Sequence, residues 1–223
     1  MKKLISLIVL TILFNKTIAV FADSPLTSTN FSSVYMDIEE VKYASEHGLD
    51  NTLLEFLISE KVNSVSKIAV INALSWGNTK NVILFENYLL KKRKGLKKDV
   101  FKFLRTESDK APEENEQTLL LSADDLICWT YLQTMGDYNR PNIGMRAAFF
   151  SYGRDLESMA HVVVFTLIAA QKAFDNDWCK VYTIPKKMLV DEQYTKNILK
   201  PEALKIILDY TGLYAECCTN NCK

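Results

Sequence analysis

Hydrophobic residues recur along most of this chain with the spacing of amphipathic helices. Between residues 50 and 58, for example, Leu53, Leu54, Leu57 and Ile58 fall on one helical face. Glycines and polar capping residues mark where such helices end and begin. The pattern predicts helices at about 36–47, 50–58, 64–76, 78–94, 96–104, 122–135, 141–152, 155–174 and 201–210.

The predicted fold class is all-α, with about nine helices packed as antiparallel hairpins. Only seven glycines and five prolines occur, which disfavours the many tight turns of a β-sandwich. Gly48 and Gly77 each end a helix, and their spacing of 29 residues makes a helical-repeat-like array the alternative arrangement. The stretch 155–174 is apolar on every side, so we expect the central helix of the second half there. Residues 175–200 read as irregular, with room for one short helix.

The N-terminus has the layout of a secretory signal peptide. Lys2 and Lys3 precede an apolar run from Leu4 to Phe14, and Ala22 offers a small residue for cleavage. This run of 11 residues is shorter than the roughly 20 needed to cross a bilayer, although an uncleaved anchor is the alternative. We therefore expect export to the periplasm or the extracellular space, and no stable membrane span after removal of residues 1–22.

The remaining chain is predicted to be a flexible lead-in at 23–35, followed by a single helical domain at 36–223 with a cysteine-containing tail. The lead-in is rich in Ser, Thr and Asn and has no hydrophobic period. Ser122 is expected to cap the helix at 122–135, because Asp125 follows three residues later.

Charge limits the classes of partner. Residues 23–223 contain 24 basic and 27 acidic residues, a net charge of −3, which disfavours nucleic-acid binding. Six basic residues nevertheless fall within eight positions at a predicted helix end, and we call them the basic segment: Lys91, Lys92, Arg93, Lys94, Lys97 and Lys98. Such a cluster is either solvated at a helix C-terminus or a docking patch for an acidic partner or anionic lipid head groups. Acidic residues between 107 and 116 would shield it.

Five cysteines are compatible with disulfides in an exported protein. Cys128 lies in an apolar helix and is expected to be a buried, unpaired side chain. The disulfide candidates are Cys179, Cys217, Cys218 and Cys222. The preferred bond joins Cys179 to Cys217 or Cys218 and ties the tail to the body, while Cys222 pairs with the other or stays free. Their spacing matches no common zinc motif, so we expect neither a metal nor a cofactor.

Histidine is scarce, and His161 is the candidate for chemistry. Glu157 lies one turn earlier on the same helix, a spacing that permits an acid–base pair. The structural alternative is a hydrogen-bonded histidine at the edge of a buried helix. No nucleophile elbow, phosphate-binding loop or dinucleotide motif is present.

The sequence therefore favours an exported, non-enzymatic helical binding protein of the cell envelope, of the inhibitor or immunity type, whose partner is another protein. The alternative is an envelope hydrolase that uses Glu157 and His161, or Glu157 with a second carboxylate. A structural or colonisation-linked surface protein is a third class that the sequence leaves open.

Overall fold

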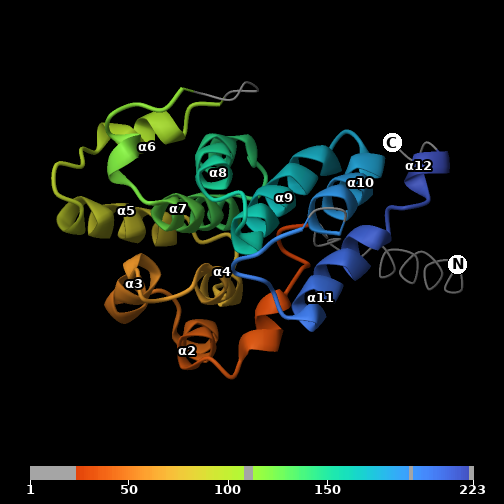
Figure 1. The fold of residues 1–223 in the computed structure, drawn as a ribbon, viewed down its shortest axis with the longest axis horizontal. Coiled ribbons are helices and arrows are strands. Elements are labelled where there is room, and N and C mark those ends of the chain that lie inside the picture. The colour runs from red at the N-terminus through yellow and green to blue at the C-terminus, as the bar shows by residue number, and fades with distance from the viewer. Residues whose placement is uncertain (1–23, 108–112, 191–192, 221–223) are drawn as a thin grey trace, which may run out of the picture.

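A computed structural model describes residues 24–107, 113–190 and 193–220 of the chain. These residues form an all-helical structure, which confirms the predicted fold class (Figure 1). The single isolated β-bridge among them joins Ser158 to Lys196. The predicted signal peptide at 1–22 lies outside the described residues.

The first half runs in the order η1 (Phe31–Tyr35), α2 (Glu39–His47), α3 (Asn51–Ile58), α4 (Ser64–Ala73), α5 (Lys80–Lys92) and α6 (Asp99–Leu104). The second half runs in the order η2 (Thr118–Leu120), α7 (Ala123–Gly136), α8 (Asn142–Arg154), α9 (Met159–Phe174), α10 (Trp178–Leu189), α11 (Pro201–Gly212) and α12 (Cys217–Asn220). Every helix predicted from the hydrophobic pattern has a counterpart here.

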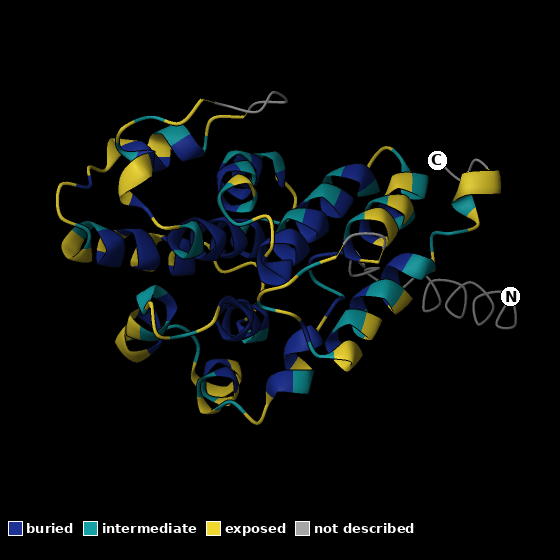
Figure 2. Ribbon diagram, viewed as in Figure 1, coloured by how far each residue is buried: buried dark blue, intermediate teal, exposed yellow. Residues whose placement is uncertain are grey.

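Helix α7 is the centre of the packing. It contacts α3, α4, α5, α8 and α9, and 12 of its 14 residues are buried (Figure 2). Helix α9 buries 12 of its 16 residues against α10, α8, α4 and α7. Because helices distant in sequence meet on α7, the packing is bundle-like.

The segment 24–35 differs from the predicted flexible lead-in. It forms a turn followed by η1, and it buries Leu26, Phe31 and Tyr35 in the hydrophobic core. Its polar residues serve this packing, because they satisfy backbone groups: the Thr29 hydroxyl, for example, donates to the Pro25 carbonyl at 2.7 Å. A segment without hydrophobic period can therefore still pack when local hydrogen bonds shape it.

Helix α10 occupies a stretch that the sequence predicted to be mostly irregular. Asp177 caps it by accepting a hydrogen bond from the Lys180 N–H, and Val181, Pro185 and Leu189 line its buried face. A proline inside a helix removes one backbone hydrogen bond, and here the burial of that face offsets the loss. Within the described ranges, no helix is long and apolar enough for a membrane crossing.

Candidate functional site

The basic segment lies where α5 ends and the chain turns into α6, at the left-hand edge of Figure 1. Lys91, Lys94, Lys97 and Lys98 are exposed there, and we call these four residues the lysine patch. Their side chains form no hydrogen bond or ion pair with any described residue. Within the described residues, no carboxylate therefore neutralises these four side chains.

Arg93 has a different role from the lysine patch. Its guanidinium donates two hydrogen bonds of 2.8 Å to the fully buried carboxylate of Asp125, and a third of 3.3 Å to the Ile58 carbonyl. The bond to Asp125 raises the pKa of Arg93. Arg93 is thus committed to holding the α5 end against α7, because a buried carboxylate needs a paired cation.

Lys92 is also engaged within the chain. Its ammonium lies 3.7 Å from Glu55 Oε1 and 5.2 Å from the centre of the Tyr88 ring. Of the six residues predicted to bind, the structure therefore leaves four with unengaged side chains.

Two exposed leucines lie beside the lysine patch. The side chain of Gln117, which precedes η2, accepts a 2.7 Å hydrogen bond from the Lys97 N–H. Leu119 and Leu120 on η2 are 64% and 40% exposed, and Leu120 lies close to the turn at Gly95. The surface thus combines cations with apolar side chains. The amino-acid order alone does not indicate this composition, because η2 belongs to a separate segment of the chain.

Glu157 and His161 occupy different environments. Glu157 is exposed, with Oε2 3.0 Å from Lys196 Nζ and 3.3 Å from the Thr195 hydroxyl. The His161 side chain is only 1% exposed, and its Nε2 lies 3.0 Å from Asp124 Oδ1. The predicted acid–base pair therefore has no support in these contacts.

His161 instead belongs to a polar cluster around Asp124. Asp124, at the start of α7, receives hydrogen bonds from the Ser64 hydroxyl at 2.7 Å, from His161 and from Lys67 Nζ at 2.5 Å. Ser64 and Lys67 lie one turn apart at the start of α4, and the Lys67 side chain is 1% exposed. We call these four residues the Asp124 cluster.

Electrostatics fix the protonation of Asp124. Burial alone would raise the pKa of this carboxyl, but the hydrogen bonds from His161, Lys67 and Ser64, together with the charge of Lys67, hold it well below its usual range. A carboxylate with so low a pKa is a weak general base at neutral pH. The Ser64 hydroxyl and Lys67 Nζ both donate to this carboxylate, so the cluster does not contain the serine–lysine hydrogen bond that would activate a nucleophile.

The Asp124 cluster borders a pocket of about 300 Å³, which Glu60 and Asp155 also line. The Nδ1 atom of His161 is buried and has no hydrogen-bond partner in the structure. The sequence contained one signal of this cluster: Lys67 is the one charged residue in the predicted helix at 64–76, directly before the apolar run at 68–71, and a lysine in such a position needs a partner if it is buried. Its partner could not be named, because Asp124 is 57 residues away.

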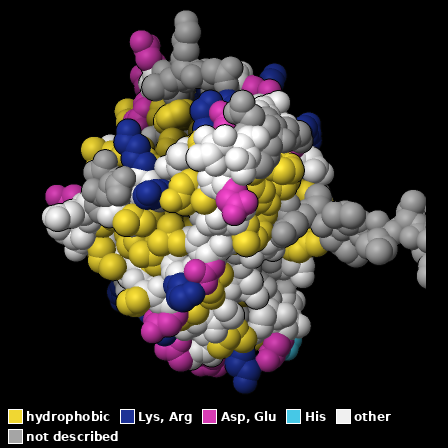
Figure 3. Space-filling view, turned by 90° about the vertical axis from the view of Figure 1, so that its right-hand side faces the viewer, with side chains coloured by type: hydrophobic (Ala, Val, Ile, Leu, Met, Phe, Trp, Pro, Cys, Tyr) yellow, Lys and Arg dark blue, Asp and Glu magenta, His cyan; other side chains and the backbone are white. Residues whose placement is uncertain are grey.

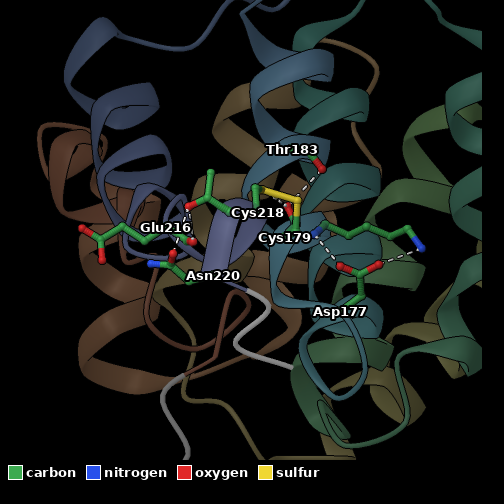
Figure 4. The surroundings of a disulfide bond; sticks show 8 residues. Asp177, Cys179, Thr183, Glu216, Cys218 and Asn220 are labelled. Carbon is green, nitrogen blue, oxygen red and sulfur yellow. Dashed lines mark hydrogen bonds and ion pairs between the residues drawn. A yellow bond between two sulfur atoms is a disulfide. The ribbon is translucent and has the colours of Figure 1, made fainter.

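The cysteine predictions are confirmed in part. Cys179 and Cys218 form a disulfide that joins the first turn of α10 to α12 (Figure 4). Cys217 is disulfide-bonded as well, and Cys222 lies outside the described residues. Cys128 is free and fully buried, as expected of a small core side chain.

The opposite end of the molecule from the lysine patch carries α10, α11 and α12. Figure 3 views this end and shows hydrophobic side chains gathered in patches, with charged groups of both signs between them. Val190 and Leu213 are 54% and 70% exposed there.

Among the described residues, no group of three or more His, Cys, Asp or Glu side chains is arranged to hold a metal ion. Comparison of the chain with protein-family models, with curated protein sequences and with solved structures finds no match. The case for function therefore rests on the chemistry of these surfaces and pockets.

Proposed function

We propose that this chain is an exported, non-enzymatic binding protein of the cell envelope that docks on an acidic surface of another protein through the lysine patch. One observation carries the proposal: four exposed lysines within eight residues make no ion pair in the described part of the chain. Surface charge of one sign steers association with a partner of opposite charge.

The surroundings of the lysine patch favour a protein partner over a lipid surface. Asp99 and Glu116 are exposed next to the lysines and η2, and an anionic membrane would repel both carboxylates. A protein partner can place a cation opposite each carboxylate and an apolar pocket opposite Leu119 and Leu120. The mixed character of the surface therefore matches an inhibitor-type or immunity-type interface.

Two features support the assignment to an exported, non-catalytic class. The Cys179–Cys218 disulfide is compatible with the oxidising compartment that the N-terminal pattern predicts. The groups with catalytic potential are committed to internal contacts, Glu157 to Lys196 and His161 to Asp124.

The experiment is a pull-down of tagged residues 23–223 from an envelope extract, followed by titration of the purified partner at low and high salt. The expected result is a saturable complex that weakens at high salt, because salt screens exposed charges. A triple charge-reversal variant should abolish it: Lys94→Glu, Lys97→Glu and Lys98→Glu.

A matched control applies the same charge change to exposed lysines elsewhere: Lys42→Glu, Lys61→Glu and Lys80→Glu. The control should bind the partner like the wild type. That result would show that binding depends on the lysine patch and not on the net charge of the chain. Equal loss in both variants, or binding that is insensitive to both, would overturn the proposal. Binding to phosphatidylglycerol vesicles without any protein partner would favour a lipid surface instead.

A further inference from the structure

A second pocket, of about 420 Å³, lies where the N-terminal segment meets the ends of α4 and α7. It shares no residue with the lysine patch or the Asp124 cluster. None of its 12 lining residues carries a charge, although a quarter of the residues in this chain are charged. An uncharged lining disfavours ionic ligands, because it offers no counter-charge for their desolvation.

One wall of this pocket offers hydroxyl and amide groups held in place by buried hydrogen bonds. Asn72 is buried, and its side-chain oxygen accepts a hydrogen bond from the Ser32 N–H at 2.8 Å. Its side-chain nitrogen donates to the Thr29 carbonyl at 3.1 Å and to the Tyr131 hydroxyl at 2.9 Å. This network fixes the turn that carries Asn30. The neighbouring polar groups are therefore preorganised for a ligand.

Asn30 and Ser33 present polar groups at the rim. The Asn30 side-chain oxygen accepts from the Ser32 hydroxyl at 2.7 Å, and its backbone carbonyl accepts from the Ser33 hydroxyl at 2.8 Å. Both residues are exposed, and hydroxyl oxygens that donate one hydrogen bond retain acceptor capacity. The Asn30 amide nitrogen adds donors.

The other wall is apolar and includes an exposed tryptophan. Trp76 is 45% exposed, and Tyr138 packs edge-on against its ring with centroids 5.4 Å apart. The next residue, Gly77, donates its N–H to the Met135 carbonyl at 2.8 Å and takes a φ of 78°, which a residue without Cβ adopts readily. These contacts hold the loop that carries Trp76 beside Met36 and Met135 at the pocket.

We propose that this pocket binds a neutral saccharide, with one pyranose ring packed on Trp76. A pyranose has a face of C–H bonds that packs on an aromatic ring and a rim of hydroxyls that donate and accept hydrogen bonds. The pocket offers the matching arrangement of an aromatic wall and uncharged amide and hydroxyl groups. The proposal is independent of the protein-docking function, because the two surfaces share no residues.

The test uses the full mature chain and four probes: D-glucose, D-galactose, D-mannose and N-acetyl-D-glucosamine. Each is added up to about 50 mM, because single sugar rings bind open pockets weakly. Saturation-transfer difference NMR detects saturation transferred from the protein to the protons of a bound sugar. The indole N–H resonance of Trp76 shows whether the sugar binds at this pocket. We expect transfer to at least one sugar and a saturable shift of that resonance.

Three variants localise the site. Trp76→Ala should weaken binding about tenfold or more, while Trp76→Phe, which keeps an aromatic face, should retain most of it. Trp178→Phe changes a tryptophan outside the pocket and should bind like the wild type. Circular dichroism checks that each variant is folded.

Three outcomes would overturn the proposal. One is the absence of transfer to all four sugars together with an unmoved Trp76 resonance. Another is sugar binding that survives Trp76→Ala unchanged in a folded protein. The last is a shift of the Trp76 resonance on addition of 1-octanol but of none of the four sugars, which would show that the pocket takes an apolar ligand.

Discussion

Asp124 is a residue whose contribution to the stability of the fold depends on three hydrogen-bond partners. Its carboxylate gathers hydrogen bonds from Ser64, Lys67 and His161, which come from two other helices. Burying a lysine and a carboxylate is costly unless each is paired, so the cluster stabilises the fold only while it is complete. The sequence offered either Glu157, within the predicted helix at 155–174, or an unnamed hydrogen-bond partner for His161, because spacing within one helix can be read from the sequence and contact between helices cannot.

Substitution Asp124→Asn should destabilise the folded state by about 3 kcal/mol at neutral pH, because it leaves the buried Lys67 ammonium without a counter-charge. Urea unfolding followed by circular dichroism measures the change. Glu157→Gln, which removes a carboxylate from an exposed ion pair, is the control and should change stability little.

The cost of Asp124→Asn should also depend on pH. The pKa of Asp124 is lower in the folded chain than in the unfolded chain, so its contribution is complete above about pH 4 and is lost as the pH falls further. The difference between wild type and variant should therefore be constant from about pH 5 to pH 7 and smaller at about pH 3. An equal difference at all pH values would contradict the ion-pair account.

At the scale of elements, local signals in the sequence predicted the helices well. Ser122 and Asp125 form the expected capping box, and the Asp50 side chain accepts from the Leu53 N–H at the start of α3. Both partners of each such contact lie within four residues, so the amino-acid order contains the whole interaction. The starts of α3 and α7 were predictable for that reason, whereas α2, α6 and α9 have no side-chain cap and begin three or four residues later than predicted.

Elements whose stability comes from distant contacts were not predictable in the same way. Helix α10 contains Pro185, which argues against a helix locally, yet its buried face packs on α9 and α11. The same limit applies to the candidate sites. The basic segment could be recognised in the sequence as a run of charges. The ion pair of Arg93 with Asp125 and the pocket beside Trp76 could not, because both depend on residues far apart in the chain.

Helix α8 provides a test of packing between elements, since it contains two glycines in opposite environments. A Cβ added to Gly144 would lie 2.5 Å from Thr134 Cγ2 and 2.9 Å from Thr130 Oγ1 on α7. Gly144→Ala should therefore force α7 and α8 apart and lower the free energy of unfolding by about 2 kcal/mol. Thermal unfolding measures the change.

Gly153 in the same helix is the matched control. Apart from its chain neighbours and the backbone of its own helix, no atom lies within 4 Å of a Cβ added there, and its φ is not positive. Gly153→Ala should stabilise the protein by about 0.5–1 kcal/mol, because alanine loses less backbone entropy in a helix. Similar effects of both substitutions would show that α7 and α8 do not approach as closely as described.

At the scale of the whole molecule, the segment 24–35 joins parts of the bundle that are distant in sequence. The Leu26 N–H donates to Gln171 Oε1 on α9 at 3.3 Å, and the Tyr35 hydroxyl accepts from the Lys200 N–H, just before α11, at 2.8 Å. Phe31, between them, is fully buried. This segment is therefore a packed part of the core and not a flexible lead-in.

Phe31→Ala tests this role directly. Removing a fully buried phenylalanine leaves a cavity, so we expect a loss of about 3–5 kcal/mol in the free energy of unfolding, measured by urea titration. Ser33→Ala, at an exposed position two residues later, should change stability by less than about 0.5 kcal/mol. If the segment were a flexible lead-in, neither substitution would change the free energy of unfolding. If it packs in the core, only Phe31→Ala should lower it. Because the same segment forms one wall of the pocket beside Trp76, the cavity at Phe31 should also weaken any ligand bound there, and the NMR titration of the variant would reveal that coupling.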